Sequence, residues 1–462
     1  MQVKVMPELP EVETVKRILN TIIVGATITD VIIHKKRIIN GDPQVFKSAL
    51  IGQTFSHVKR IGKYLIFTFN SDLVMLSHLR MVGKFIEVLL GEEDSKYAHV
   101  IFVLNDGRRL CYDDSRQFGK LELSTNEEYM KTKAMQNVGP EPFDIDPATY
   151  FHNIQNRSTP IKQTLLDQKL MSGLGNIYVD EVLYLSRVHP ETPTNSIDFK
   201  TVKLLIEYSI KVLNAAIAQG GTTVRSYRPA AGVHGHFQQQ LHAYGKAYEK
   251  CPTCNFRFKK IFVGGRGTTY CPSCQINPSV PLTIAITGQK ASGKTVISDY
   301  LRSIGETVID TDSLAKSFYQ DLNLTKKLEQ KLATSLHDND VFDLDLLRAY
   351  LLANPKQIKV INALIHPLVK TEISKIIKES NKDRLYFEIP LPFSYKIYEL
   401  FNFIIGVEIS VEKQQENLEK RGENLGINAD NEYMKNRHRL DLIIVNDGTK
   451  ADLINKFKTF KV

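Results

Sequence analysis

The sequence predicts a multidomain protein in which an α+β part is followed by an α/β part. The chain has 462 residues, which exceeds the usual size of one domain. Two closely spaced pairs of cysteines end at Cys274, and a glycine-rich phosphate-binding sequence begins at Gly288. One compact domain seldom needs both features, so we expect the two parts to join near residue 281.

The composition is that of an ordinary soluble protein, with 42% hydrophobic and 24% charged residues. The sequence contains no apolar run long enough to span a membrane, and no secretory signal with a cleavage site. We therefore expect a cytoplasmic protein without a membrane partner, and we expect it to be a monomer.

Basic residues are concentrated in the first part of the chain. Residues 1–281 contain 34 Lys and Arg against 26 Asp and Glu, and residues 201–281 alone carry 10 basic and 2 acidic side chains. Such an excess favours a polyanion partner, DNA or RNA. A solvated basic face would give the same composition.

The order of the predicted elements supports these fold classes. Apolar residues recur at helical spacing over residues 7–20. Short β-rich segments separated by turn residues follow and predict a β-sandwich or barrel; they are 31–33, 64–69, 73–76, 84–89 and 100–104. Helical periods return over 125–220, and two strands are expected within 245–275. From residue 282 strands alternate with helices, which predicts a parallel sheet.

The two cysteine pairs predict a structural metal site. Thiolates bind Zn2+ tetrahedrally, and two Cys-x2-Cys turns supply four ligands without strain. In a reducing compartment this spacing favours metal ligands over disulfides. Four thiolates leave no open position for water, so we expect one structural Zn2+, bound by Cys251, Cys254, Cys271 and Cys274.

The sequence from Gly288 to Thr295 has the pattern of a P-loop. It follows a β-rich segment and precedes a helical one, which is the context that this loop needs. Lys294 would reach the β- and γ-phosphates of ATP, and Thr295 would hold Mg2+. Backbone N–H groups would cradle the phosphates, so we expect an ATP site formed by Gly288, Ser292, Gly293, Lys294 and Thr295.

The first part of the chain resembles the formamidopyrimidine-DNA glycosylases, which remove oxidised purines such as 8-oxoguanine from DNA. The matching blocks occur in the family's order; they are Met6-Pro-Glu-Leu-Pro-Glu-Val-Glu-Thr14, Ile61-Gly-Lys-Tyr-Leu65, His78-Leu-Arg-Met81, Arg116-Gln-Phe-Gly119, Gly173-Leu-Gly-Asn-Ile-Tyr178, Gly220-Gly-Thr-Thr-Val-Arg225 and Gly264-Gly-Arg-Gly267. The resemblance implies an N-terminal β-sandwich, a helix–two-turns–helix domain and a zinc-finger hairpin. Endonuclease VIII, a related family that removes oxidised pyrimidines, usually has glycine where Leu9 stands, so Leu9 favours the purine enzymes.

The resemblance implies a Schiff-base mechanism that starts from Pro7. A terminal proline is a secondary amine that can attack the sugar C1′. Glu8 would be the acid and base that opens the sugar ring, and Lys63 would lie near the lesion and its phosphate. Met1–Val5 precede Met6 in this sequence, and inside a chain the Pro7 nitrogen is an amide without nucleophilic character. We therefore expect the active form to start at Met6 and to lose it.

The resemblance also implies DNA contacts, because such enzymes flip the target base out of the duplex. Met81, Arg116 and Phe118 match the residues that fill the vacated space, and residues 222–236 match a loop that closes over the flipped base. Further expected DNA contacts are His78, Asn176 and Arg266.

Taken singly, several of these residues have ordinary structural explanations. Met81 and Phe118 are types often found in a core, Lys63 could be a surface lysine, and Pro7 could be the first residue of a helix. If Pro7 is never terminal, the first part would bind lesions without cutting them.

The second part resembles dephospho-CoA kinase, which uses ATP to phosphorylate the ribose 3′-hydroxyl of dephospho-CoA. The blocks are Val308-Ile-Asp-Thr-Asp312-Ser-Leu-Ala-Lys316, Leu364-Ile-His-Pro367, Glu388-Ile-Pro-Leu391 and Val445-Asn-Asp-Gly448. The resemblance implies that Asp312 orients or deprotonates the hydroxyl and that Arg421 stabilises the transferring phosphoryl group. Asp312 could instead be a helix N-cap.

This part also departs from the kinase pattern. Lys316 and Asn417 stand where the family has arginine, and the block after Pro390 reads Leu-Pro-Phe-Ser in place of Leu-Leu-Phe-Glu. Another nucleotide kinase, or a domain that only binds nucleotide, therefore remains an alternative.

Together these observations predict a bifunctional enzyme that acts on double-stranded DNA containing oxidised bases and on ATP and dephospho-CoA. The expected domains are a catalytic β-sandwich at 1–125, a helix–two-turns–helix domain at 126–240, a zinc finger at 241–276, a linker at 277–281 and a P-loop kinase domain at 282–462.

Overall fold

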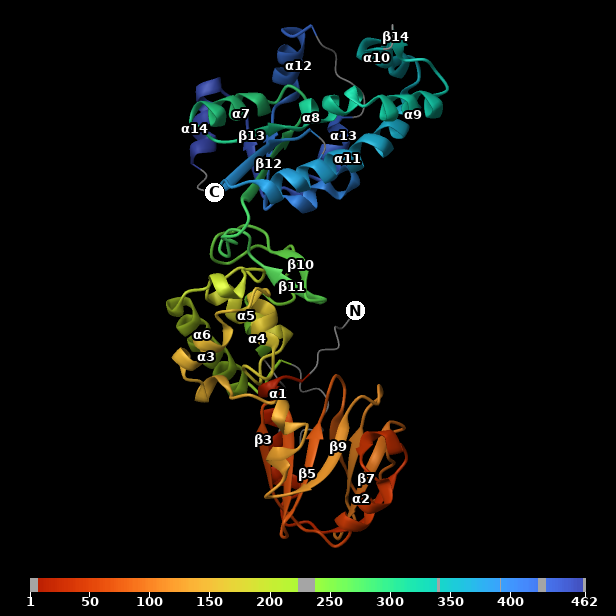
Figure 1. The fold of residues 1–462 in the computed structure, drawn as a ribbon, viewed down its shortest axis with the longest axis vertical. Helices are drawn as coiled ribbons and strands as arrows, with labels where there is room; N and C mark the ends of the chain where they lie inside the picture. The colour runs from red at the N-terminus through yellow and green to blue at the C-terminus, as the bar shows by residue number, and fades with distance from the viewer. Residues whose placement is uncertain (1–6, 223–236, 339–340, 391, 423–428, 460–462) are drawn as a thin grey trace. The chain divides into compact units, whose positions relative to one another are not determined.

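The computed structural model describes residues 7–222, 237–338, 341–390, 392–422 and 429–459. The chain divides into two compact units, Met1–Gln275 and Ile276–Val462. Figure 1 shows both units, with labels on many of their helices and strands. Among the described residues, no helix is both long enough and apolar enough to cross a membrane.

The first unit begins with helix α1 (Leu9–Ile22) and two facing sheets. One sheet has the order β1-β7-β8-β6, and the other has the order β2-β9-β5-β4-β3. The strands are β1 (Ile28–Ile33), β2 (Ile39–Asn40), β3 (Phe55–Ile61), β4 (Tyr64–Phe69), β5 (Leu73–His78), β6 (Lys84–Val88), β7 (Ala98–Leu104), β8 (Arg109–Asp113) and β9 (Lys120–Thr125). Helix α2 (Pro43–Leu50) contributes Phe46 and Leu50 to the core that these sheets share. The predicted β-sandwich is confirmed.

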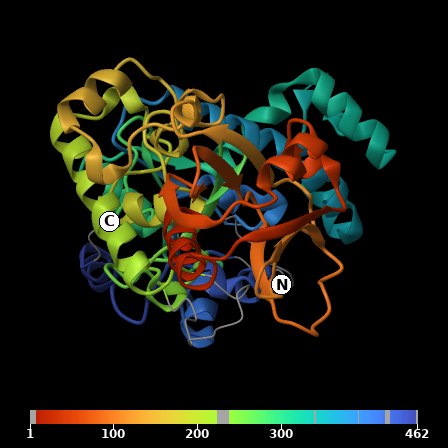
Figure 2. The ribbon, with the colours of Figure 1, turned by 90° about the horizontal axis from the view of Figure 1, so that it is seen from below.

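A helical part follows the sandwich in the same unit. It contains α3 (Pro147–Ile154), α4 (Ile161–Leu166), α5 (Asn176–Leu185) and α6 (Phe199–Ala218). Helix α1 belongs to both cores, because Val12, Val15 and Leu19 pack in the sandwich while Leu9 packs among the helices. Figure 1 shows α1 at this junction, and Figure 2 shows the same ribbon seen from below.

A two-stranded hairpin ends the first unit. Strands β10 (Lys259–Val263) and β11 (Arg266–Tyr270) pair antiparallel through the turn at Gly264 and Gly265. One cysteine pair precedes β10 and the other follows β11, as the sequence predicted.

The second unit is built on a five-stranded parallel sheet with the order β13-β16-β12-β17-β18. Its strands are β12 (Leu282–Gly288), β13 (Val308–Asp310), β16 (Arg384–Glu388), β17 (Phe403–Glu408) and β18 (Leu442–Val445). Between β13 and β16 in the sequence, β14 (His337–Asp338) and β15 (Val341–Phe342) form a separate antiparallel pair. The helices are α7 (Lys294–Ser303), α8 (Thr311–Ser317), α9 (Leu322–Leu332), α10 (Leu344–Ala353), α11 (Ile358–Glu379), α12 (Val411–Glu419), α13 (Ala429–Lys435) and α14 (Lys450–Lys458).

Strand β12 is central in this sheet and every one of its residues is buried. The chain leaves it directly into the glycine-rich loop, which places that loop at the carboxyl edge of the sheet, where ligands bind in open α/β folds. The predicted parallel-sheet α/β part is confirmed. The finer division into four domains and a linker remains a prediction.

Candidate active sites

The first candidate site forms where the start of α1 meets the start of α5. The Glu8 side chain is 1% exposed and accepts hydrogen bonds from the backbone N–H groups of Gly175 (2.7 Å) and Ile177 (2.9 Å). These donors are the N-cap and the second residue of α5, and the partial positive charge at this end of the helix favours a carboxylate. The Glu8 carboxylate therefore lies in an anion-binding site formed by the N-terminus of α5, a helix far from Glu8 in the sequence.

Two glycines make this close approach possible. A Cβ on Gly175 would lie 2.3 Å from the Glu8 Cδ, and a Cβ on Gly173 would lie 2.4 Å from the Leu9 Cδ1. Gly173 also has a φ of +99°, a conformation that favours glycine. The block Gly173-Leu-Gly175 thus lets the two helices meet at Glu8.

Lys63 completes the buried part of this site. Its side chain is 5% exposed, and its Nζ donates to the Leu174 carbonyl (2.7 Å), so the interpretation as a surface lysine is wrong. Burial raises the pKa of Glu8 to about 7, against the opposing effect of Lys63. Burial likewise lowers the pKa of Lys63, against the opposing effect of Glu8. The two groups thus lie close enough to influence each other's charge.

Pro7 lies immediately before this carboxylate. Glu8 is the N-cap of α1 and Leu9 is its first residue, so Pro7 is not the first residue of a helix. Residues 1–6, which decide whether the Pro7 nitrogen is an amine, lie outside the described residues.

Sequence reasoning missed Glu11, which ties Glu8 to the helical part. Its Oε2 accepts from the Glu8 N–H (3.0 Å), and its Oε1 accepts from the Tyr178 hydroxyl (2.6 Å) and the Thr222 N–H (2.8 Å). The spacing Glu8-x-x-Glu11 is that of a capping box and could have predicted the first contact. Thr222 is the last described residue before 223–236, so the rest of the predicted closing loop lies outside the described residues.

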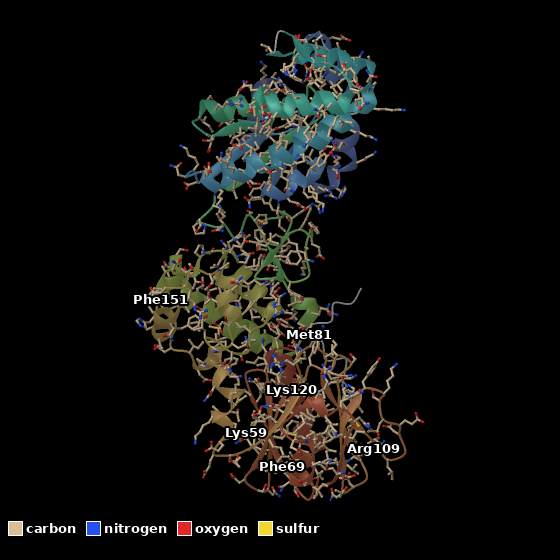
Figure 3. The ribbon with its side chains drawn as sticks, turned by 45° about the vertical axis from the view of Figure 1, so that its right-hand side comes forward. Lys59, Phe69, Met81, Arg109, Lys120 and Phe151 are labelled. Atoms are coloured by element: carbon tan, nitrogen blue, oxygen red, sulfur yellow. The ribbon has the colours of Figure 1, made fainter. Side chains whose placement is uncertain are left out.

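The three residues predicted to fill the space of a flipped base lie together. The Arg116 Nη1 donates to the Met81 Sδ (2.9 Å), and the Arg116 guanidinium lies 4.7 Å from the centre of the Phe118 ring. Phe118 is 45% exposed, so it is not a core residue. Figure 3 shows Met81 at the end of the sandwich that faces the helices of the same unit.

Asp114 shapes the loop that carries Arg116 and Phe118, and sequence reasoning missed it. Its carboxylate accepts from the N–H groups of Arg116 (3.0 Å), Phe118 (2.8 Å) and Gly119 (2.7 Å). An aspartate just before a turn that ends in glycine is the available signal. A Cβ on Gly119 would collide with the Tyr112 hydroxyl, so the loop needs glycine there.

His78 is buried beside Tyr64, and its Nδ1 accepts from the Arg80 N–H (2.9 Å). Burial, with the nearby charges of Arg80 and Lys63, lowers the pKa of His78 to about 3. A neutral His78 supports the turn that leads to Met81, and its predicted contact with DNA stays a prediction.

The hairpin that carries Arg266 is fastened to α5. The Asn176 Nδ2 donates to the Gly267 carbonyl (3.0 Å), which places Asn176 next to the exposed Arg266. Behind them, the fully buried Lys162 Nζ contacts the Asp180 Oδ1 (2.5 Å) and the Thr268 Oγ1 (2.8 Å). The Asp180 Oδ2 accepts from the Thr269 N–H (3.0 Å). No sequence signal indicated this ion pair.

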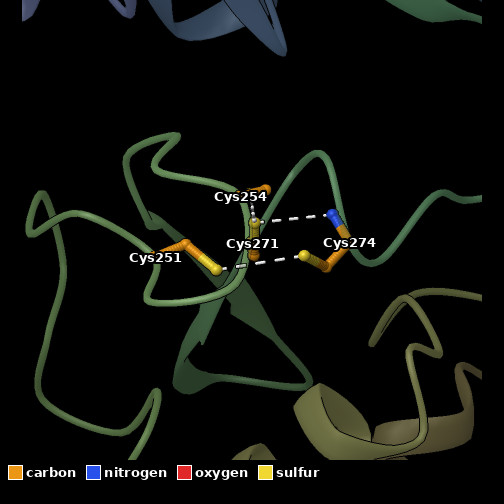
Figure 4. Close-up of side chains that lie close together, drawn as sticks. All are labelled: Cys251, Cys254, Cys271 and Cys274. Carbon is orange, nitrogen blue, oxygen red and sulfur yellow. Dashed lines mark hydrogen bonds between the residues drawn. The ribbon is translucent and has the colours of Figure 1, made fainter. Parts of the chain in front are cut away.

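The four predicted zinc ligands converge at the base of the hairpin, with all four Sγ atoms within 4.8 Å of one another (Figure 4). The Cys251–Cys274 and Cys254–Cys271 sulfur distances are 3.9 and 3.4 Å. Four thiolates around tetrahedral zinc at about 2.3 Å have sulfurs about 3.8 Å apart, so this donor set is consistent with structural zinc. The Tyr184 hydroxyl on α5 contacts the Cys251 Sγ (3.2 Å).

The second candidate site surrounds the glycine-rich loop between β12 and α7. Gly293 has a φ of +104° and Gly288 one of +153°, conformations that favour glycine. The Lys294 Nζ donates to the carbonyls of Gly288 (3.1 Å) and Gln289 (2.9 Å). The Thr295 hydroxyl donates to the Glu388 Oε1 (2.8 Å) at the end of β16. The loop thus gathers a lysine, a hydroxyl and a carboxylate at one edge of the sheet.

Asp312 lies in the first turn of α8, after β13. Asp310 is the N-cap, because its carboxylate accepts from the Asp312 N–H (2.9 Å) and the Ser313 hydroxyl (2.7 Å), so the interpretation of Asp312 as the cap is wrong. Desolvation, and next the nearby Asp310 carboxylate, raise the pKa of Asp312. Arg421 lies exposed in the turn after α12, and Lys316 lies exposed in the last turn of α8.

Three family models match successive parts of the chain. The formamidopyrimidine-DNA glycosylase N-terminal domain matches residues 6–121, and the formamidopyrimidine-DNA glycosylase H2TH domain matches residues 138–228. Dephospho-CoA kinase matches residues 282–452.

Individual relatives cover the first unit. The formamidopyrimidine-DNA glycosylase of Bacillus anthracis is 43% identical over 277 residues, which are 58% of this chain and 99% of the relative. That of Ligilactobacillus salivarius is 42% identical over 276 residues, 59% of this chain and 99% of the relative.

Solved structures agree with these relatives. The Lactococcus lactis enzyme in complex with DNA containing N7-benzyl-Fapy-dG is 39% identical with a TM-score of 0.56, and covers 59% of this chain and 100% of that one. Its complex with abasic-site DNA is 39% identical with a TM-score of 0.55, and covers 58% of this chain and 99% of that one.

Proposed function

Because the chain belongs to the formamidopyrimidine-DNA glycosylase family through its first unit and carries a dephospho-CoA kinase domain in its second, we propose that it is a bifunctional enzyme. The first unit removes oxidised purines from double-stranded DNA and cleaves the resulting abasic site by β- and δ-elimination. The second unit transfers the γ-phosphoryl group of ATP to the 3′-hydroxyl of dephospho-CoA.

The observation that carries the glycosylase proposal is the buried carboxylate of Glu8 between Pro7 and the start of α5. Once Pro7 is terminal, its nitrogen attacks the sugar C1′ while the bond from C1′ to the base breaks. Glu8, with a pKa raised to about 7, delivers a proton to the ring oxygen, which opens the sugar and leaves a Schiff base on Pro7. Lys63 positions the nucleotide beside this pair.

The remaining residues of the first unit hold the DNA in this proposal. Met81, Arg116 and Phe118 enter the space that the flipped base leaves, and their mutual contacts preform the wedge. Asn176 and Arg266 bind the phosphates beside the lesion. The zinc site keeps the Arg266 hairpin folded, and its four thiolates leave no position for a reacting water.

A borohydride trap tests the first activity. The full chain, expressed from its native start region, is incubated with a duplex containing 8-oxoguanine opposite cytosine, and the reduced adduct is mapped by peptide mass spectrometry. We expect the adduct on a peptide that begins at Pro7. Tight lesion binding without an adduct, in protein that retains Met1, would instead identify a lesion-binding unit that does not cut.

The observation that carries the kinase proposal is the glycine-rich loop with Thr295 against Glu388 and with Asp312 at the same edge of the sheet. Oxygen ligands from Thr295 and Glu388 suit Mg2+, directly or through water, and the ion would neutralise charge on the phosphates. Asp312 orients and deprotonates the 3′-hydroxyl. Lys294 and Arg421 stabilise charge on the transferring phosphoryl group.

Phosphoryl transfer from radiolabelled ATP to dephospho-CoA tests the second activity. We expect turnover by the full chain and a loss of at least about 100-fold in Lys294→Ala. The matched control is Lys326→Ala, an exposed lysine on α9. Intact ATP binding without transfer to dephospho-CoA would reject the substrate and leave a nucleotide-binding domain or a kinase of another substrate.

A further inference from the structure

Side chains from the glycine-rich loop itself and from two other elements hold the backbone of that loop. Five consecutive carbonyls, from Gly288 to Ser292, each accept a hydrogen bond from a side-chain nitrogen. Lys294 serves the first two. The next three are served by amides: Gln414 Nε2 donates to Lys290 (2.9 Å), Asn417 Nδ2 to Ala291 (3.2 Å) and Asn446 Nδ2 to Ser292 (2.8 Å).

The three amides come from two separate elements of the second unit. Gln414 and Asn417 lie one turn apart on α12, and Gln414 is only 2% exposed. Asn446 follows β18. The loop also binds back, because the Gln289 Oε1 accepts from the Ile409 N–H (3.0 Å), just before α12. Helix α12 is therefore fastened to the loop near both of its ends.

These contacts determine where the loop directs its N–H groups. In a planar trans peptide the C=O and the following N–H point in opposite directions. Anchoring the carbonyls of Lys290, Ala291 and Ser292 outward turns the next N–H groups away from the amides. The Ser292 N–H donates to the Gln289 carbonyl within the loop (3.3 Å), so the N–H groups of Ala291 and Gly293 are those that this anchoring directs toward a phosphate. Successive N–H groups on one side of a loop form an anion-binding concavity. Neutral amides provide this anchoring without adding a charge beside the phosphates.

We propose that Gln414, Asn417 and Asn446 form an amide clamp that holds the phosphate-binding loop in its nucleotide-binding conformation. In this proposal Asn417 is a positioning residue of the loop, although the kinases that this part resembles have an arginine at this position. Gly293 is part of the same arrangement, since a Cβ there would lie 2.8 Å from the Asn446 Nδ2. The clamp rests on the proposed nucleotide-binding function of the second unit.

Binding of MgATP to the full chain, measured by isothermal titration calorimetry, tests the clamp. Asn417→Ala removes the donor, and Asn417→Arg restores the residue type of the resembling kinases. We expect both to raise the Kd of MgATP by about three- to tenfold, as one lost hydrogen bond to a carbonyl implies. Asn446→Ala should give a similar increase. The control is Gln415→Ala, because the exposed Gln415 amide on the same helix donates to the exposed Glu419 (3.3 Å), and its Kd should equal that of the wild type.

Two results would overturn the clamp. One is an unchanged Kd for MgATP in both Asn417→Ala and Asn446→Ala. The other is faster phosphoryl transfer in Asn417→Arg with undiminished MgATP binding. That result would show that this position serves phosphoryl transfer, as the arginine of the resembling kinases does, and not the conformation of the loop. A wild type that binds MgATP without phosphorylating dephospho-CoA would reject the proposed substrate only, since the clamp is decided by the Kd ratios.

Discussion

The two units place their proposed catalytic carboxylates in opposite surroundings. Glu8 is buried and bonded to the backbone of a helix that lies far along the chain. Asp312 is exposed, although partial desolvation and the neighbouring Asp310 raise its pKa, and it lies two residues after the carboxylate that caps the same helix. The first site therefore depends on the packing of α1 against α5, whereas the second depends on a local turn. Changes in the first unit should thus affect charge and stability together.

The largest difference between the activities of the two units is expected from Glu8→Gln. A glutamine lacks the proton that opens the sugar and presents an N–H2 group to backbone donors, so excision should fall on the order of 10³-fold. Single-turnover excision from a duplex with 8-oxoguanine measures this loss. Phosphorylation of dephospho-CoA should be unchanged, because Glu8 belongs to the first unit.

The exposed Glu127 provides the control for this substitution, and Glu127→Gln should excise at the wild-type rate. Near-normal excision by Glu8→Gln would remove the carboxylate from the mechanism. A parallel loss of kinase turnover would contradict the independence of the two units.

The second-largest effect is expected at the ion pair behind the zinc hairpin. Lys162→Met leaves Asp180 buried without its partner, which should destabilise the first unit by about 3–5 kcal/mol. The double variant with Asp180→Leu should recover most of this loss, because both charges are then absent. Denaturant unfolding measures the free energy, and the exposed Lys169→Met is the control.

An equal loss in the single and double variants would show that side-chain volume, not charge, determines the result. In the second unit Glu388 is paired with the neutral hydroxyl of Thr295. Removing both side chains there should therefore not recover stability in the way expected for Lys162 and Asp180.

The same contrast explains what the sequence could predict. Features set by local spacing were predicted well: the P-loop from Gly288 to Thr295, the helix that follows it, and the cysteine pairs. The carboxylate of Glu8 could be proposed only from its resemblance to a family, because its donors, Gly175 and Ile177, lie in another element.

Long-range polar contacts were not predictable in either unit. Lys162 and Asp180 have no spacing that indicates a pair, and burial of both follows from how α4, α5 and the hairpin pack. The contacts of Gln414 and Asn417 with the loop depend likewise on where the fold places α12. A single sequence records which side chains can donate, whereas tertiary packing decides which carbonyl each one meets.

A smaller effect is expected from pH. Because burial raises the Glu8 pKa from 4.5 to about 7, the folded first unit binds this proton more tightly than the unfolded chain does. Its contribution to stability is complete below pH 4.5 and is lost as pH rises through about 7. Excision should also fall about tenfold per pH unit above 7, because the acid is then deprotonated.

Both trends are measured by single-turnover excision rates and by denaturant unfolding between about pH 5 and pH 9, a range that brackets the Glu8 pKa of about 7. The stability trend should weaken in Glu8→Gln, which has no proton to lose. Excision that stays flat to pH 9 (about two units above that pKa) in the wild type would exclude Glu8 as the proton donor.

The smallest effect is expected from the contact between α5 and the four-cysteine cluster that we propose binds zinc. Tyr184→Phe keeps the ring beside Phe258 but removes the hydroxyl that contacts the Cys251 Sγ and the Thr253 hydroxyl (2.8 Å). Outer hydrogen bonds of this kind stabilise metal ligands, so zinc release to a colorimetric chelator should accelerate by a few-fold, up to about tenfold. Tyr208→Phe, on α6, should release zinc at the wild-type rate. Helix α5 also contacts the hairpin through Asn176 and Asp180. Unchanged zinc release from Tyr184→Phe would therefore show that these two contacts support the hairpin without the contact between the Tyr184 hydroxyl and the Cys251 thiolate.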